Sequence, residues 1–473
     1  MKRLPSFFPL LSAVIAAGGC LLLVTAAQDA VTGWKAGAAS VAITPSDPLW
    51  MAGYGGRKEP SDGTKLTELS AKALVLEDAD GKRGLVISLD LVGIDREMSA
   101  RICQQIEAAH GIKREQIAIA TSHTHSGPVV GRRNLGPLHW WLLDADQQKK
   151  VDAYAEELVA KVVAVAGEAI GKLAPARVQW GSGQSTFAVN RRENLPQTDV
   201  PNLRERGILK GPIDHDVPVL SVRDPESGSI RAVLFGYACH ATTLSGMQWC
   251  ADYPGYAQMA IEAEHPGSVA LFWAGCGADQ NPLPRKEVAL AQAYGAELAE
   301  AVEETLDAPM PLVAPTLTTR FQEIDAPLAE VPTVDQLEQT AATVEGYEGA
   351  RARYLLNEKE LGKGDDAGLD GTYPYPVGVW SLGNEVDFIW LGGEVVVDYA
   401  IRLKRERRGE QTWVAGYSND VMAYIPSLRV LKEGGYEGGG SNVYYGLPAL
   451  WDETIEETIV GAVNEIQAPA KGQ

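Results

Sequence analysis

The chain has 473 residues, of which 45% are hydrophobic and 22% are charged. These fractions are typical of a globular protein and exclude a disordered or fibrous chain. The formal net charge of −20 argues against nucleic acid as a partner, and against binding to anionic lipid through charge, because both need a basic surface.

The first residues have the pattern of a targeting signal. Lys2 and Arg3 precede an apolar stretch at 7–24, and small residues follow it. We therefore expect residues 1–27 to be a cleaved signal peptide. A retained N-terminal anchor and lipidation at Cys20 are the alternatives. All three place the protein outside the cytoplasm (periplasmic, extracellular or membrane-anchored), with membrane contact only through this segment.

Segments with strand and helix periodicity alternate along most of the chain. We expect strands at 71–77 and 84–90 to form a hairpin, followed by a helix at 96–110 that ends at Gly111. The other expected elements are, in chain order, strand 116–120, helix 152–170, strands 176–180, 217–223, 230–238 and 269–273, helices 287–306 and 334–361, strands 386–391 and 413–417, and helix 452–466.

This order predicts an α/β fold with mixed β-sheets flanked by helices. The polar, glycine-rich segment 363–371 is expected to be a linker or flap, and no clean domain boundary is visible. Four cysteines remain after Cys20, and an exported chain would allow three disulfide pairings among them. They are Cys103, Cys239, Cys250 and Cys276. For Cys103 we favour a buried thiol.

Histidines follow two of the predicted strands. An apolar strand at 117–120 leads directly into His123 and His125. In an extended segment these two side chains would point to the same side, where they could bind a metal ion. The alternative is a pair of hydrogen-bonded loop histidines.

A third histidine and an acid occupy similar positions. His240 follows the strand at 233–238, and Glu394 follows an apolar strand across Gly392 and Gly393. A catalytic zinc site needs three or four nitrogen or oxygen ligands and an open position. The sequence contains neither the H-E-x-x-H motif of zinc proteases nor the G-x-S-x-G motif of serine hydrolases, so these two classes of enzyme are excluded.

The most distinctive motif is Ser122-His123-Thr124-His125-Ser126-Gly127-Pro128. Further motifs occur in a fixed order around it: Lys35-Ala36-Gly37, Ala42-Ile43-Thr44-Pro45, Met51-Ala52-Gly53-Tyr54, Val189-Asn190-Arg191, Cys239-His240-Ala241-Thr242, Asp252-Tyr253-Pro254-Gly255-Tyr256, Gly392-Gly393-Glu394, Ser418-Asn419, Tyr424 and Tyr436-Glu437-Gly438. With these motifs, residues 34–467 resemble the catalytic domain of the neutral and alkaline non-lysosomal ceramidases.

The resemblance implies a zinc hydrolase that cleaves the amide bond of N-acylsphingosine or a similar small-molecule or lipid N-acyl substrate, using water activated by the metal. It implies that Zn²⁺ is held by His123, His240, Glu394 and Tyr424. It also implies that His125 faces the substrate and donates to the oxyanion or to the leaving nitrogen. Arg191 would support developing negative charge, and Tyr436 would donate a hydrogen bond near the carbonyl.

The sequence departs from the family pattern in two places. Gln280 stands where the family has a serine that was proposed to be catalytic, and we expect no C-terminal β domain. These departures keep two other functions open. One is a zinc esterase or deacetylase that acts on a more polar substrate. The other is a binding protein that retains the metal without turnover.

Overall fold

The structure is a computed structural model that describes residues 33–133, 136 and 138–467. The predicted signal peptide and Cys20 lie outside the described residues. Within the described part of the chain, no helix is both long enough and apolar enough to cross a membrane.

A mixed sheet of eight strands forms the centre of the molecule, in the order β4-β3-β2-β1-β5-β7-β8-β9. The strands are β1 Trp34–Ala42, β2 Ser70–Glu77, β3 Arg83–Leu89, β4 Ile117–Thr121, β5 Ala174–Gln184, β7 Asp216–Arg223, β8 Ile230–Tyr237 and β9 Val269–Ala274. The β3–β4 and β8–β9 pairs are parallel, and the other pairs are antiparallel. The outer strands β4 and β9 contact each other, so the sheet curls back on itself.

A second sheet packs against the first, in the order β11-β12-β13-β15. Its strands are β11 Leu317–Pro327, β12 Thr372–Leu382, β13 Val386–Leu391 and β15 Thr412–Ala415. Strand β13 is buried on both faces: Phe388 and Trp390 face the aromatic layer between the sheets, while Ile389 and Leu391 join the core on the other side. This explains its continuous apolar sequence, because side chains alternate between the two faces of a strand.

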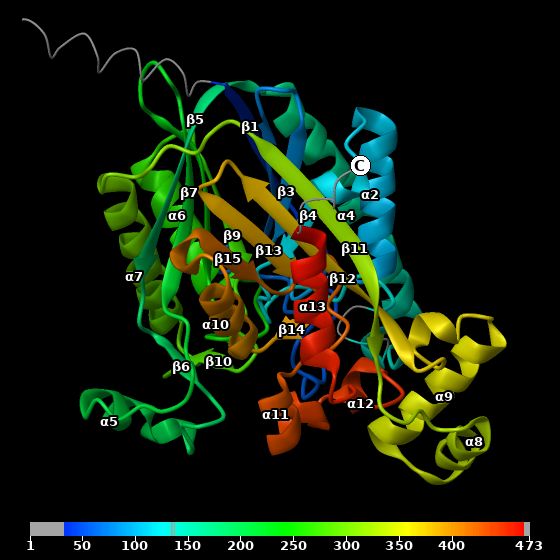
Figure 1. The fold of residues 1–473 in the computed structure, drawn as a ribbon. Coiled ribbons are helices and arrows are strands. Elements are labelled where there is room, and N and C mark those ends of the chain that lie inside the picture. Colours follow the sequence, from blue (N-terminus) through cyan, green and yellow to red (C-terminus); the bar gives the residue numbers. More distant parts are fainter. Residues whose placement is uncertain (1–32, 134–135, 137, 468–473) are drawn as a thin grey trace, which may run out of the picture.

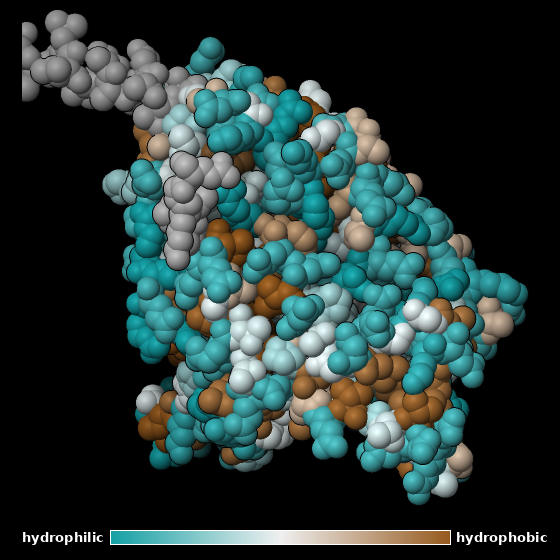
Figure 2. All heavy atoms as spheres, turned by 45° about the vertical axis from the view of Figure 1, so that its right-hand side comes forward, coloured by the Kyte–Doolittle hydropathy of each residue, from teal (hydrophilic) through white to brown (hydrophobic). Residues whose placement is uncertain are grey.

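Helices cover the outer faces of both sheets (Figure 1). Helices α2 Arg96–His110 and α4 Ala145–Gly171 lie at one end of the large sheet, and α6 Asp252–Glu264 and α7 Val288–Asp307 lie at the other. The small sheet is covered by α10 Val397–Glu406 and α13 Ile455–Gln467. The fold therefore has four layers, helices outside and sheets inside. Hydrophilic side chains cover most of the face drawn in Figure 2, as the acidic composition leads one to expect.

The short elements surround the ends of the central strands. They are β6 Ala188–Asn190, β10 Gln280–Pro282, β14 Glu394–Val395, β16 Tyr424–Ile425, α3 Leu138–Trp141, α5 Val200–Glu205, α8 Val334–Thr343, α9 Gly346–Glu360, α11 Leu428–Glu433 and α12 Asn442–Tyr445. Those labelled in Figure 1 gather at its lower end. They enclose the carboxyl ends of β4, β8 and β13, where the candidate site lies.

The structure confirms the predicted α/β class and many of the elements. The hairpin of β2 and β3 forms, and α2 has the predicted bounds because Asp95 accepts from Met98 N at its start and Gly111 adopts φ 69° at its end. The long helix expected at 334–361 is wrong, since the chain breaks between α8 and α9 where Gly346 has φ 74°. The disulfides that export would allow do not form, because the four cysteines of the described chain are free, buried thiols.

Several elements escaped prediction for physical reasons. Strand β11 is the polar edge strand of its sheet, and β12 contains two prolines. The first turn of α6 contains Pro254 and Gly255, which are typical of a turn.

Candidate metal centre

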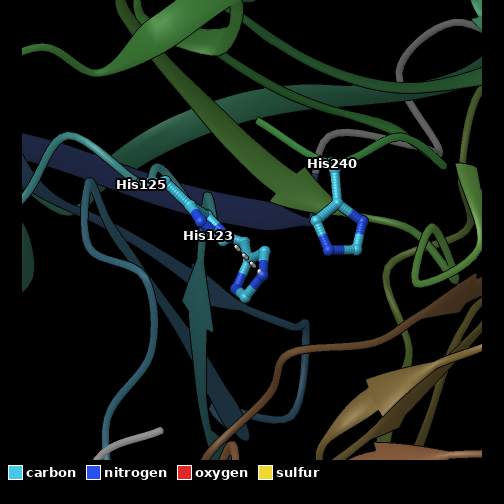
Figure 3. Close-up of side chains that lie close together, drawn as sticks. All are labelled: His123, His125 and His240. Carbon is cyan, nitrogen blue, oxygen red and sulfur yellow. Dashed lines mark hydrogen bonds between the residues drawn. The ribbon is translucent and has the colours of Figure 1, made fainter. Parts of the chain in front are cut away.

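Residues from four separate strand ends meet at one point. His123 and His125 follow β4, and His240 follows β8 (Figure 3). Glu394 begins β14, and Tyr424 begins β16. Because β14 and β16 pair in parallel with Glu394 opposite Tyr424, backbone pairing places these two side chains next to each other.

The donor atoms of this cluster are spaced as ligands of one metal ion would be. Glu394 Oε2 lies 3.2 Å from His123 Nε2 and 3.1 Å from His240 Nε2. His240 Nε2 lies 3.3 Å from the Tyr424 hydroxyl oxygen. Tetrahedral ligands at about 2.0–2.1 Å from zinc are separated from each other by about 3.3 Å. The cluster therefore has room for one ion at its centre.

Neighbouring groups orient each of these ligands. His123 Nδ1 lies 2.5 Å from the Val92 carbonyl oxygen, and His240 Nδ1 lies 2.8 Å from that of Gly277. A carbonyl can only accept, so each Nδ1 carries the proton and each Nε2 directs a lone pair into the cluster. On the carboxylate, the Tyr445 hydroxyl donates to Glu394 Oε1, which leaves Oε2 facing the two imidazoles.

The charge state of the cluster favours a cation. Burial opposes the ionisation of Glu394, but the positive charge and hydrogen bonds that His123 and His240 supply in their protonated form outweigh it and hold the pKa of this carboxyl well below its usual value. Burial, assisted by the positive charge of Arg191, lowers the pKa of His240 to about 4. Glu394 Oε2 accepts no hydrogen bond within the described chain, because the adjacent Nε2 atoms carry no proton. A carboxylate and two lone pairs held this close repel one another unless a positive ion lies between them.

His125 differs from the other two histidines. Its Nε2 lies 3.1 Å from His123 Nε2, but its buried Nδ1 has no hydrogen-bond partner among the described residues. Its ring packs against Tyr54 and Gly53, where a Cβ at Gly53 would lie 2.4 Å from Nδ1. Burial and the other two histidines hold the pKa of His125 well below its ordinary value. One ring nitrogen from each of the three imidazoles lies within 4.8 Å of the other two, so His123, His125 and His240 form an alternative ligand set.

His123 and His125 were expected to point to the same side because the chain would be extended there. That reason is wrong, although their rings do lie close together. Strand β4 ends at Thr121, and His123 has φ 58° in the left-handed region. The segment is therefore not extended, and side-chain alternation does not apply to it. The rings meet because the loop turns back after the strand, with ring centroids 4.8 Å apart.

Arg191 lies behind Tyr424, and its guanidinium is largely satisfied by hydrogen bonds to other residues of the chain. It donates to the Tyr424 hydroxyl oxygen at 3.0 Å, to Asn281 Oδ1 at 3.2 Å and to Glu437 Oε1 at 2.6 Å. Burial raises the pKa of Tyr424 well above its ordinary value, and the Arg191 guanidinium acts against this rise.

Tyr436 lies at the rim of the site. Its ring is 5.3 Å from that of Tyr424, and the residue is 47% exposed. Burial of the hydroxyl raises the pKa of Tyr436 to about 12, so the phenol stays protonated at neutral pH.

Gln280 lies behind the cluster, on β10. Its backbone oxygen accepts a hydrogen bond from His240 N at 3.0 Å, and its side-chain Nε2 donates to Pro212 O at 3.2 Å. The residue is fully buried, so its backbone supports the loop of His240 and its side chain does not line an open cavity.

Sequence reasoning missed the groups that orient the ligands. Tyr445 contacts Glu394, and the Tyr417 ring packs 4.4 Å from that of His123. No motif marks Tyr445, and the carbonyls of Val92 and Gly277 belong to residue types that carry no chemical signal.

Comparisons with known proteins agree with this fold. The family model described as neutral/alkaline non-lysosomal ceramidase, N-terminal, matches residues 34–279, more than half of the chain. The chain belongs to this family. The matched range includes His123, His125 and His240, whereas Glu394 and Tyr424 lie beyond it and are brought to the histidines by the fold.

Individual relatives are distant in sequence. Neutral ceramidase A of Dictyostelium discoideum is 22% identical over 213 residues, which cover 42% of this chain and 28% of that protein. The alignment thus spans little more than a quarter of that relative. A structure described as ceramidase complexed with C2 superposes with a TM-score of 0.67 at 18% identity, over 93% of this chain and 77% of its own. Neutral ceramidase from Pseudomonas aeruginosa gives a TM-score of 0.66 at 18% identity, over 93% and 76% of the two chains. These superpositions show a shared α/β fold.

Proposed function

We propose that the protein is a zinc-dependent amidohydrolase that cleaves the amide bond of an N-acyl substrate similar to N-acylsphingosine. The observation that carries the proposal is the convergence of His123, His240, Glu394 and Tyr424, with donor atoms 3.1 to 3.3 Å apart and a buried carboxylate oxygen that lacks a hydrogen-bond donor. Membership of the ceramidase family supports the same reaction class.

These four residues would hold the metal. A zinc ion bound there supplies Lewis acidity, which polarises a carbonyl oxygen and makes water more acidic. The Nδ1 contacts of the histidines and the Tyr445 hydroxyl fix the ligands before binding, so little reorganisation is needed.

His125 is positioned to move the proton. Its low pKa keeps the ring neutral near pH 7, and Nε2 faces the cluster. Nε2 would take a proton from the attacking water and pass it to the leaving nitrogen, a role usually worth about 10²–10⁴ in rate.

Two residues would stabilise developing negative charge. The protonated Tyr436 hydroxyl would donate to the oxyanion from the rim. Arg191 would act through Tyr424, because its guanidinium donates to that hydroxyl and favours negative charge on it.

A second candidate, a zinc esterase or deacetylase on a more polar substrate, is favoured by one observation. Charged residues make up half of the wall of the cavity of about 660 Å³ beside Arg191 and Tyr436. A binding protein without turnover is less well supported, since it has no need of His125, Arg191 and Tyr436 around the same centre. On the strength of the expected signal peptide, we also propose that the protein acts outside the cytoplasm.

Metal content and hydrolysis measured on the same sample test the proposal. We expect about one zinc per chain by elemental analysis, and release of fatty acid from a fluorogenic N-acylsphingosine that stops after chelation and returns with zinc. The variants His123→Ala and His240→Ala should lose both metal and activity. A His265→Ala control should keep both, because His265 forms a separate pair with Glu303 at 2.9 Å. Zinc without ceramide turnover would favour the polar-substrate alternative, and failure to bind zinc at all would contradict the proposal.

A further inference from the structure

An open cavity beside the metal centre contains an arginine with no partner. The cavity has a volume of about 660 Å³, and its wall includes Arg191, Tyr436 and Arg285. Arg191 and Tyr436 both contact Tyr424, so the cavity adjoins the proposed reaction site.

The other cavity arginines are neutralised by protein carboxylates. Arg191 donates to Glu437, while Arg192 pairs with Glu437 at 2.8 Å and with Glu433 at 3.0 Å. Arg285 forms no hydrogen bond or ion pair with any residue that the structure describes, although it is half-buried. The remaining acid of the cavity wall, Glu193, is exposed to water, which stabilises its charge without a partner.

Hydrogen bonds to the backbone of its two neighbours in the chain hold Arg285 in position. The Tyr294 hydroxyl donates to the Pro284 carbonyl oxygen at 2.7 Å, and Lys286 N donates to Thr243 O at 2.6 Å. The guanidinium also lies close to Tyr54, whose pKa burial raises to about 12 and on which Arg285 is the strongest opposing charge. Tyr54 packs against His125 with ring centroids 4.8 Å apart, so Tyr54 links Arg285, on the cavity wall, to the base of the proposed reaction.

A half-buried guanidinium without a counter-ion gains more from an anionic partner than one that is already paired. Its planar fork matches a carboxylate, which it can bind through two parallel hydrogen bonds. The chain as a whole carries a net charge of −20, so an anionic substrate needs such a local cation to bind. We propose that Arg285 binds a carboxylate on the substrate, and that the preferred substrates are N-acyl compounds with a carboxylate on the amine side, such as N-acyl amino acids. This inference rests on the proposed amide hydrolysis.

A matched pair of amides tests the inference. N-dodecanoylglycine and N-dodecanoylethanolamine share an acyl chain and differ in whether the amine side ends in a carboxylate or a hydroxyl. For the full-length, zinc-loaded protein we expect kcat/KM to favour the glycine amide by about tenfold or more. Arg285→Gln should lower kcat/KM for the glycine amide by about ten- to hundredfold, the range typical of a hydrogen bond to a charged group, and leave the ethanolamide within about twofold.

Two further variants serve as controls. Arg285→Lys should retain part of the preference, since it keeps the charge and loses the bidentate geometry. Glu193→Gln, on the same cavity wall, should change the ratio of the two kcat/KM values by less than about twofold. Equal kcat/KM for the two amides in the wild type, or equal losses for both in Arg285→Gln, would overturn the inference.

A binding measurement separates this inference from the proposed function. N-dodecylsulfonylglycine carries the same carboxylate on a sulfonamide that is not cleaved. Its Kd by calorimetry should rise about ten- to hundredfold in Arg285→Gln, whereas that of the corresponding ethanolamine sulfonamide should not change. If neither amide is cleaved but this difference in binding appears, the proposed function fails and the carboxylate site stands. If the Kd does not change, the carboxylate site is refuted even where amides are cleaved.

Discussion

Two clusters of buried or half-buried charged groups lie side by side in this protein and differ in how their charge is balanced. In the metal centre, Glu394 faces two imidazole lone pairs and has no cation among the described residues. In the adjacent arginine cluster, formed by Arg191, Arg192, Glu433 and Glu437, every charged group has an opposite partner. The charges of the arginine cluster are therefore balanced by protein groups alone, whereas those of the metal centre are balanced only when a positive ion binds. Arg191 joins the two clusters through the Tyr424 hydroxyl.

Removing one acid from each cluster should give the largest difference between the two clusters in their effect on zinc binding. Glu394→Gln removes the only carboxylate of the metal centre, and we expect zinc affinity to fall by about a hundredfold or more and hydrolysis to be lost. Glu437→Gln should leave zinc affinity within about threefold and lower the melting temperature, because it leaves two guanidinium groups with one fewer partner. Competition with a chelator of known affinity, together with calorimetry, measures both effects. Equal losses of zinc in the two variants would mean that the clusters are not separate.

A third buried acid, Asp420, extends the comparison to pH. It accepts a hydrogen bond from the Tyr373 hydroxyl at 2.9 Å, and burial raises its pKa to about 7. Because this lies above the value of about 3.9 in an unfolded chain, the protonated form stabilises the fold. This stability is complete below about pH 4 and is lost as the pH rises through about 7.

Asp420→Asn removes that titration and keeps an acceptor for Tyr373. Relative to wild type, the variant should become more stable as the pH rises from 4 to 8, by up to about 4 kcal/mol at about 1.4 kcal/mol per pKa unit. Urea unfolding at a series of pH values measures this difference. A difference between the two proteins that is constant with pH would show that Asp420 is already ionised in the fold.

The effect of ligand orientation on zinc affinity can be tested without removing a ligand. Tyr445→Phe deletes the hydroxyl that donates to Glu394 Oε1 and preserves the ring. We expect zinc affinity to fall by about ten- to hundredfold, the usual effect of losing a hydrogen bond to a metal ligand. Tyr444→Phe is the matched control, because this neighbouring ring is 36% exposed and should tolerate the change. An unaltered affinity in Tyr445→Phe would show that Glu394 needs no orienting group.

The smallest effect on activity is expected at Gln280. This side chain lies behind His240 and outside the cavity, so Gln280→Ser should leave kcat within about threefold of wild type. It should also lower the free energy of unfolding by about 1–2 kcal/mol, because it replaces a buried side chain by a smaller one. A large gain in hydrolysis would mean that a serine at this position takes part in the reaction.

Helices and strands could be predicted where the sequence signals for them lie within one segment of the chain. Helix α2 was predicted with its bounds because the signal for its end, Gly111, lies next to the helix in the sequence. Strand β11 was missed because it is polar and becomes a strand only by pairing with β12 along its whole length. Sheet pairing between distant segments leaves little local trace in the sequence.

The residues of the candidate site also differ in whether the sequence could predict them. His123, His125 and His240 stand out because imidazoles after apolar strands are rare in this chain, but their geometry was not predictable: His123 adopts a left-handed conformation. Tyr424 was inferred only from the family resemblance, and the reason for its place, direct pairing with Glu394 in β14 and β16, appears only in the folded chain. Tyr445 and the two orienting carbonyls could not be predicted, since nothing in a single sequence marks a backbone oxygen or one tyrosine among 16.

An anomalous difference map at the zinc edge, from crystals grown with zinc, tests the central claim most directly. We predict one strong peak at about 2 Å from His123 Nε2, His240 Nε2 and Glu394 Oε2. A peak bound by His125 in place of Glu394, or no peak in the cluster, would contradict the assignment.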